Sequence, residues 1–207
     1  MVYSAQWEGK PSEVFTARLD LAEAQALSLA QGAWLAGLHG GEALIHYAEV
    51  PAPLDFPAGP LARMPLMGGT PRDVAENILD SDWGSTGDFA VIRGQPLPKP
   101  HSWLEYPMGK TLLESSAERR LREPRVSPRG NRVALIEGDF GASGGDVVVV
   151  DRSGHRTVLS SGWMEVDGLA WSPDGREVWF TAGGSALGGV SSWGHAQGTA
   201  RGVPRRA

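Results

Sequence analysis

A strand–turn–strand pattern that recurs at a nearly constant interval constrains the fold of this chain more than any other feature. The clearest copy spans residues 168–182, where an apolar strand follows a turn made of Ser172, Pro173, Asp174 and Gly175. Proline presets φ at the second position of such a turn, aspartate accepts bonds from nearby backbone N–H groups, and glycine adopts the left-handed conformation. We therefore predict a hairpin with these four residues at its turn.

The same pattern occurs three times upstream, with decreasing fidelity. Residues 124–136 repeat it with Ser127, Pro128 and Gly130 at the turn. A degraded copy occupies residues 82–92, and a fainter one occupies residues 34–45. The turn glycines, which are spaced 46, 43 and 45 residues apart, are Gly41, Gly87, Gly130 and Gly175. Such a regular period indicates a repeat architecture.

A second predicted hairpin lies between each pair of these turns. It is clearest over residues 145–159, with its turn near Gly154, and it recurs over residues 103–113 and 61–74. Each period thus supplies four short strands and two turns, which is the content of one β-propeller blade. We expect residues 1–182 to be all-β and to form a partial β-propeller of about four four-stranded antiparallel blades.

The two ends of the repeat carry separate expectations. Residues 2–5 match residues 179–182, the strand after the turn, so the chain is expected to begin in mid-blade. Residues 19–31 have the Ala, Leu, Glu and Gln content of a helix, but the period assigns them to an outer hairpin. From Gly183 the pattern stops, and the composition of residues 183–207 predicts a disordered tail. We expect a fragment of a larger gene product, truncated or frameshifted near Gly183.

The charge distribution argues against binding to nucleic acid. Residues 1–182 carry 24 acidic and 16 basic side chains, which gives a net charge of −8. A body of this charge repels the phosphate backbone. A basic cluster is diluted by Glu118, Glu123 and Glu137, and we interpret it as a solvated rim. Its members are Arg119, Arg120, Arg122, Arg125, Arg129 and Arg132.

Several other classes of site are excluded by what the sequence lacks. The chain contains no cysteine, which excludes disulfide bonds, thiolate catalysis and thiolate metal ligands. It has no run of about 18 apolar residues, so no membrane segment is predicted. The N-terminus lacks the basic and apolar regions of a signal peptide. These features leave the compartment unknown.

Two short motifs resemble catalytic signatures. Asp139, Phe140 and Gly141 spell the metal-binding tripeptide of kinases, but the glycine-rich loop, strand lysine and catalytic loop are absent. Residues 141–145 match the G-x-S-x-G nucleophile elbow, with Ser143 at its centre. That motif requires a helix after the turn, whereas a strand is predicted here. We interpret the segment as a flexible glycine loop.

The remaining candidate ligands show no metal-binding spacing. Asp151 and His155 lie on the hairpin that follows Ser143, and Asp167 with Asp174 could hold a cation, although Asp174 already has a role in its turn. The histidines are His39, His46, His101, His155 and His195. We predict no catalytic, cofactor-binding or metal-binding residues, and assign purely structural turn roles to the glycines, serines, prolines and aspartate named above.

The turn signature at residues 171–175 and the hairpin at residues 150–154 resemble the TolB-like, WD-type propeller repeats of bacteria. The resemblance covers most of residues 1–182 and is strongest over residues 120–182. The chain is similar in particular to the propeller region behind the kinase domain and membrane anchor of some bacterial serine/threonine kinases. That resemblance implies a sensing or interaction module in a periplasmic or extracytoplasmic location. Related propellers usually have six or more blades.

We therefore expect a non-catalytic binding or sensory module whose partner, an unknown protein or small ligand, binds at a propeller face. The alternative is the propeller of a prolyl-oligopeptidase-like enzyme that lacks its hydrolase domain. A third alternative is a fragment with no function of its own.

Overall fold

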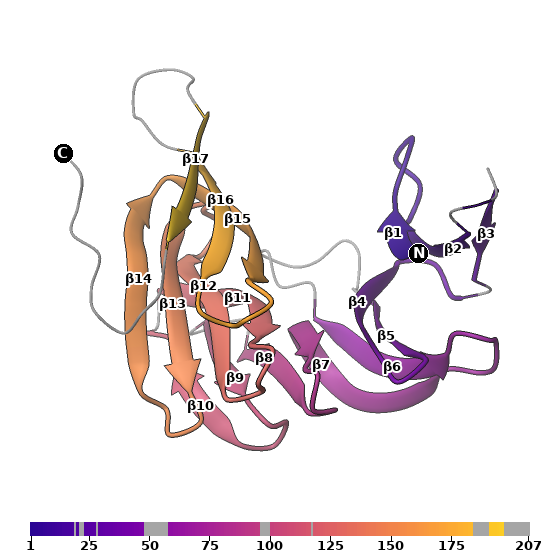
Figure 1. The fold of residues 1–207 in the computed structure, drawn as a ribbon, viewed down its shortest axis with the longest axis horizontal. Coiled ribbons are helices and arrows are strands. Elements are labelled where there is room, and N and C mark those ends of the chain that lie inside the picture. Colours follow the sequence, from indigo (N-terminus) through magenta and orange to yellow (C-terminus); the bar gives the residue numbers. More distant parts are fainter. Residues whose placement is uncertain are drawn as a thin grey trace. The chain divides into compact units, whose positions relative to one another are not determined.

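In the computed structural model, all regular elements of the described residues are β-strands (Figure 1). The structure describes residues 1–47 except 19, 21, 22 and 28, residues 58–95, residues 100–183 except 117, and the backbone of residues 191–196. The chain divides into two compact units, residues 1–79 and residues 80–207, and each is described by itself. Within the described ranges, no helix is long and apolar enough to span a membrane.

The first unit contains two antiparallel sheets, which we number blades 1 and 2. Blade 1 has three strands: β1 (Val2–Ala5), β2 (Glu13–Ala17) and β3 (Ala24–Ala26). Strands β4 to β10 form one seven-stranded sheet in the order β10-β9-β8-β7-β6-β5-β4, which we divide into two blades within β7. Blade 2 is its part in this unit, formed by β4 (Ala33–His39), β5 (Glu42–Tyr47), β6 (Gly59–Pro65) and the first part of β7 (Arg72–Trp83). The apolar core between the two sheets consists of Val14, Ala33, Ala43, Ile45 and Met64.

The second unit contains blades 3, 4 and 5. Blade 3 comprises residues 80–83 of β7 with β8 (Phe89–Gln95), β9 (His101–Glu105) and β10 (Thr111–Glu114). Blade 4 comprises β11 (Arg119–Val126), β12 (Arg132–Asp139), β13 (Gly145–Asp151) and β14 (Arg156–Trp163). Blade 5 comprises β15 (Glu165–Trp171), β16 (Val178–Gly183) and β17 (Ser191–Ala196). The expected all-β fold of antiparallel blades is confirmed.

The central strands of blade 4 are buried on both faces. Residues 133–136 of β12 and 147–150 of β13 are continuously apolar, and each of these residues is buried. An uninterrupted apolar strand is expected where a sheet is covered on both sides. On the side of blade 5, Ala134, Val149 and Phe180 belong to one core cluster. Packing of this kind stabilises by about 1.5–3 kcal/mol for each large side chain that becomes fully buried.

The four turn glycines lie between the first two strands of successive blades. All have positive φ: 81° at Gly41, 88° at Gly87, 66° at Gly130 and 70° at Gly175. The N–H of Gly175 donates to the carbonyl of Ser172 at 2.8 Å, and Gly130 donates to Ser127 at the same distance.

Side chains of the two serine turns complete these loops. Ser172 Oγ accepts from the N–H of Glu177 at 2.9 Å, and Ser127 Oγ accepts from the N–H of Arg132 at 3.1 Å. Asp174 accepts from the hydroxyl of Ser172 and from the N–H of Arg176. Pro128 and Pro173 follow the serines, where fixed φ favours the turn. These residues therefore have structural roles in the two turns.

The ends of the chain differ partly from expectation. Within the segment 19–31, which has helix propensity, the structure has strand β3, as the period requires. Within the segment 183–207, where the sequence predicts disorder, it has β17, which pairs with β16 through Val178 and Ala196. Strand pairing is made by backbone groups, so a glycine- and serine-rich segment can add to an available sheet edge. The rest of the predicted tail after Gly183 lies outside the described residues.

Candidate functional site

The first strands of blades 3, 4 and 5 are joined by carboxylates that accept hydrogen bonds from the backbone of the next blade. Asp80 Oδ2 accepts from the N–H of Glu123 at 2.7 Å, across 43 residues of sequence. Glu123 Oε2 in turn accepts from the N–H of Gly168 at 2.9 Å, across 45 residues. Because both intervals are close to one repeat, the same type of bond connects successive blades.

Arginines of β11 extend this connection to blade 5. Arg122 Nη2 donates to the carbonyl of Val166 at 2.8 Å, and Arg125 Nε donates to the carbonyl of Leu169 at 3.1 Å. Only 16% of the Arg122 side chain is exposed. The interpretation of this arginine cluster as a solvated rim is therefore wrong for Arg122 and Arg125. Composition shows how many arginines a segment holds, but burial depends on the blade that covers it.

Two β-bulges meet at the centre of this site. The register of β11 shifts between Arg122 and Arg125, where Glu123 has a φ of 52°. The register of β15 shifts between Asp167 and Ala170, next to Gly168. A bulge redirects side chains and frees backbone N–H groups from the ladder. The bulge of β15 thus presents the N–H of Gly168 to the Glu123 carboxylate.

The two carboxyl groups at the bulges, those of Glu123 and Asp167, have pKa values shifted in opposite directions. Burial, followed by the hydrogen bond to Asp167, raises the pKa of Glu123 to about 7. The same hydrogen bond holds the pKa of Asp167 below its ordinary value. Glu123 therefore carries a proton over much of the acidic range and donates it toward the ionised Asp167. Burial also raises the pKa of nearby Asp82, which accepts from the N–H of Val126 at 2.7 Å.

These carboxyl groups are engaged in protein contacts rather than arranged around a cation. Among the described residues there is no group of three or more His, Asp or Glu that could hold a metal ion. Asp167 is paired with Glu123, while Asp174 accepts from Ser172 and Arg176 in its turn. The sequence hypothesis that Asp167 and Asp174 hold a cation receives no support from this arrangement.

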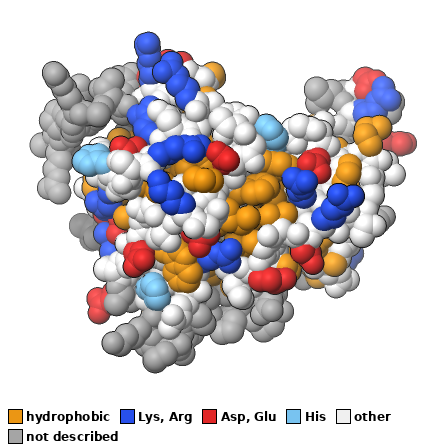
Figure 2. All heavy atoms as spheres, turned by 90° about the horizontal axis from the view of Figure 1, so that it is seen from below, with side chains coloured by type: hydrophobic (Ala, Val, Ile, Leu, Met, Phe, Trp, Pro, Cys, Tyr) orange, Lys and Arg blue, Asp and Glu red, His pale blue; other side chains and the backbone are white. Residues whose placement is uncertain are grey.

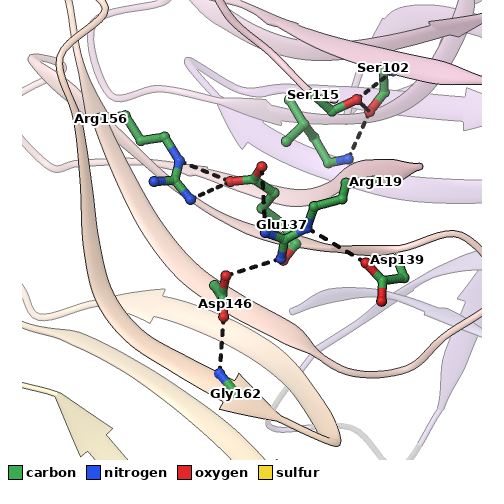
Figure 3. A network of polar contacts seen from close by, with 9 residues as sticks. Ser102, Ser115, Arg119, Glu137, Asp139, Asp146, Arg156 and Gly162 are labelled. Atoms are coloured by element: carbon green, nitrogen blue, oxygen red, sulfur yellow. Dashed lines mark hydrogen bonds and ion pairs between the residues drawn. The ribbon is translucent and has the colours of Figure 1, made fainter. Parts of the chain in front are cut away.

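A second polar network connects all four strands of blade 4 (Figure 3). Glu137 is 8% exposed, and its Oε2 accepts from Arg156 Nε at 2.9 Å and Nη2 at 2.6 Å. Arg119 Nη2 donates to the Glu137 carbonyl at 2.6 Å and to Asp146 Oδ2 at 3.0 Å. Asp146 also accepts from the N–H of Gly162. Arg119 is therefore part of a structural network and is a further exception to the solvated-rim interpretation.

The glycine loop around Ser143 is shaped by close backbone contacts. A Cβ atom at Gly138 would collide with the carbonyl oxygen of Gly144. The carbonyl of Ser143 accepts from Arg122 Nη2 at 2.6 Å and from the N–H of Val166 at 3.1 Å. Strand β13 follows the loop directly, so the strand–turn–helix geometry of a nucleophile elbow is not formed.

Ser143, Asp151 and His155 are not brought together. Ser143 precedes β13, Asp151 is its last residue and His155 follows it, so the length of a seven-residue strand, roughly 20 Å, separates Ser143 from the other two. Asp151 instead accepts from the backbone N–H of His155 at 3.0 Å. Asp139, from the kinase-like tripeptide, lies 3.7 Å from Arg119 Nε in an ion pair.

The histidines are dispersed. His46 is buried, with its Nε2 2.8 Å from the carbonyl of Ile78, and the ring of His101 stacks on Trp103. His39 lies in β4 and His155 in the turn after β13, while the side chain of His195 lies outside the described residues.

Sequence reasoning missed Asp80, Asp82 and Glu123 as blade-connecting residues. The signal that could have identified them is the spacing of Asp80, Glu123 and Gly168, which follows the repeat. Carboxylates at repeat intervals were visible in the sequence, but which backbone N–H each one meets depends on the two bulges.

Comparison with known proteins gives structural likeness alone. No protein-family model and no curated protein matches the chain. A TolB-type protein of Agrobacterium tumefaciens matches with a TM-score of 0.65 and 18% identity, over 90% of this chain and 72% of that one.

Two enzymes also match in structure. An oligogalacturonate lyase solved with manganese matches with a TM-score of 0.54 and 12% identity, over 88% of this chain and 55% of that one. A prolyl endopeptidase matches with a TM-score of 0.50 and 13% identity, over 88% of this chain and 32% of that one. At these identities the likeness concerns the fold, and this chain has the all-β fold of a partial, TolB-like β-propeller.

Proposed function

We propose that the chain is a non-catalytic binding module of the β-propeller type and that it associates through the face of blade 5 that carries Trp179. The observation that carries the proposal is the exposure of this tryptophan, 44%, at a position that the repeat buries elsewhere. A large exposed aromatic residue on a flat strand is a common anchor in protein interfaces.

The repeat position of Trp179 follows from the hydrogen bond that closes each turn. The acceptor carbonyls of these bonds belong to Asp88, Arg132 and Glu177 in blades 3, 4 and 5. Two residues after each acceptor stand Ala90, Ala134 and Trp179, respectively. Both alanines have no exposed surface, whereas Trp179 is held outward by a bond from its Nε1 to Glu177 Oε2 at 2.9 Å.

The absence of catalysis is supported by the use of the polar side chains. Glu123 and Glu137 are engaged in connections within and between blades, and Ser143 lies far from Asp151 and His155. Figure 2 shows one face of the surface, on which hydrophobic side chains lie beside those of Lys, Arg, Asp and Glu. We further propose that the module serves a larger bacterial protein such as a receptor-type serine/threonine kinase, on the strength of its turn motifs and fold.

In a purified sample, the partner that the Trp179 face meets is a second copy of this chain. We expect sedimentation equilibrium to show reversible association that Trp179→Thr shifts toward the monomer. Trp34→Thr is the matched control, because Trp34 is similarly exposed, at 41%, but lies on β4. A wild-type chain that stays monomeric, or equal association of Trp179→Thr and wild type, would refute association through the Trp179 face.

A second candidate is the propeller of a prolyl-oligopeptidase-like peptidase, which the likeness to a prolyl endopeptidase favours. The neighbouring coding sequence separates the two: a kinase domain with a membrane segment supports the first candidate, and a hydrolase domain supports the second. Steady ester or peptide hydrolysis that Ser143→Ala abolishes would overturn the non-catalytic assignment itself.

A further inference from the structure

A hollow of about 290 Å³ opens between blades 4 and 5 of the second unit. Its apolar wall is formed by Val149, Leu159, Trp171 and Val178, and its polar residues are Arg132, Asp151, His155 and Thr157. A mostly apolar hollow with a few polar groups at its margin is typical of a small-molecule site, and this volume is near the lower end for such sites.

The repeat explains why the hollow exists. In blade 3 the N–H of Tyr106 donates to the carbonyl four residues later, that of Lys110; in blade 4 the N–H of Asp151 does the same with His155. The two residues therefore have the same position relative to their hairpin turns. Tyr106 is fully buried, and its hydroxyl donates to the carbonyl of Gly130 in blade 4 at 2.9 Å. A tyrosine thus fills the space between blades 3 and 4.

Asp151 does not fill the corresponding space between blades 4 and 5. It is smaller than tyrosine, and its Oδ1 is turned toward its own hairpin, where it accepts from Ser153 and His155. The hollow is therefore at the junction where the repeat has no counterpart of the Tyr106 ring. Apolar cavities smaller than this one, of about 150 Å³, bind benzene-sized molecules.

Arg132 supplies a cationic group beside the apolar wall. Its guanidinium lies 5.2 Å from the centre of the Trp171 ring, and its Nη2 donates to the carbonyl of Gly175 at 2.8 Å. These contacts orient the group, and a guanidinium has five N–H donors, so one bond leaves capacity for a ligand. Arg132 also lines a smaller neighbouring hollow with Arg129 and Arg176, where Asp174 is the acidic residue, so positive charge prevails in that neighbouring hollow. In the larger hollow the acidic residue is Asp151, whose Oδ1 accepts from its own hairpin.

We propose that this hollow binds a small aromatic carboxylate. Its ring would lie between blades 4 and 5, in the space that corresponds to the one filled by Tyr106 between blades 3 and 4, and its carboxylate would lie on Arg132. The apolar wall selects for the ring, and the guanidinium selects for a planar anion. The site is distinct from the Trp179 face, because alternating residues of β16 point to opposite sides and Val178 is the residue that lines the hollow.

The test uses the full chain and three probes: phenylacetate, the neutral ring analogue 2-phenylethanol, and acetate. We expect saturation-transfer NMR and calorimetry to detect phenylacetate binding, weaker 2-phenylethanol binding and no acetate binding. Arg132→Gln should lower the affinity for phenylacetate by about tenfold, to that of the neutral analogue. Arg63→Gln, a change in an exposed ion pair of the first unit, is the control that should change nothing.

Asp151→Tyr is the decisive variant, because it installs the residue that blade 3 has at this position. We expect it to abolish binding of both ring probes. Because it also removes the turn bonds of Asp151, Thr157→Phe serves as a second variant that fills the hollow and keeps those bonds. Phenylacetate binding that survives in folded forms of both variants would overturn the proposal. So would a wild-type chain that binds no probe at about 10 mM, a concentration above the dissociation constant of about 1 mM that marks weak binding. Association through Trp179 is measured separately, so either result can fail alone.

Discussion

Glu123 and Asp167 meet where the bulge of β11 lies against the bulge of β15, and their carboxyl groups share a hydrogen bond. Below about pH 7 the Glu123 carboxyl is protonated while that of Asp167 is ionised, because burial and the partner's charge oppose a second negative charge. Since the two bulges belong to different blades, the protonation of Glu123 is coupled to the packing of blade 4 against blade 5.

This pair predicts that stability falls as the pH rises. The pKa of Glu123 in the folded chain is about 7, above its ordinary value of 4.5. A group with a raised folded pKa stabilises at low pH, and its contribution is lost as the pH rises through the folded pKa. The pKa of Asp167 is lowered, so its contribution is lost only in strong acid. We expect the melting temperature to decrease between about pH 5 and pH 8.

Glu123→Gln isolates this effect, since glutamine resembles the protonated carboxyl and cannot ionise. Thermal melts of the variant should show a flatter pH dependence than the wild type over that interval. Glu13→Gln, an exposed position in β2, is the matched control and should retain the wild-type slope. Parallel slopes for wild type and Glu123→Gln would contradict the assignment of the titration to Glu123.

The blades could be predicted from the sequence because their turns are local. Gly130 and Gly175 need positive φ, and the serines and prolines before them act within a few residues. Residues that connect different blades, such as Glu123, depend on bulges and on the register of separate sheets, which no local pattern encodes. Arg122 and Arg125 were misinterpreted for the same reason: their acceptors are carbonyls 44 residues away.

The junction hollow illustrates a second limit. Tyr106 and Asp151 are equivalent by their turn hydrogen bonds, but nothing nearby in the sequence shows that one fills an interblade space. Aligning the two hairpins in sequence suggests the equivalence. The consequence, a hollow lined by Val149 and Val178, requires blades 4 and 5 to be packed together.

Glu137→Leu should destabilise the second unit strongly. It removes the carboxylate that accepts two bonds from Arg156, so the charge of Arg156 loses its partner, while Arg119 loses a 3.9 Å ion pair but keeps Asp146. Because both arginines are partly exposed, we expect a loss on the order of 1–3 kcal/mol, below the range for fully buried pairs. Urea denaturation measures it.

A double-mutant cycle with Arg156→Leu provides the control for Glu137→Leu. If the network acts as described, the double variant should lose less than the sum of the two single variants. Strict additivity would show that the Glu137–Arg156 contact contributes no coupling.

Gly138→Ala should be destabilising even though its added methyl group is small. The Cβ would collide with the carbonyl oxygen of Gly144, a backbone atom that cannot rotate away. Relief requires movement of the loop before β13, and overpacking of this kind costs about 1–3 kcal/mol. Gly141→Ala offers a comparison, since its Cβ meets no atom within 4 Å although its φ of 74° imposes some strain. Equal melting temperatures of Gly138→Ala and wild type would contradict the collision.

The final prediction separates a structural turn residue from an apparent catalytic one. Gly175 has a φ of 70°, and a Cβ there would lie 3.4 Å from Cδ of Pro128. Gly175→Val places a β-branched side chain in the left-handed region, which should cost on the order of 1–3 kcal/mol. Ser143→Ala should stay within about ±0.5 kcal/mol, because the contacts of Ser143 that hold the loop are made by its carbonyl, which alanine retains. Thermal melts and a generic ester hydrolysis assay compare the two variants. Loss of a real hydrolytic activity in Ser143→Ala, together with an unchanged melt for Gly175→Val, would reverse both assignments.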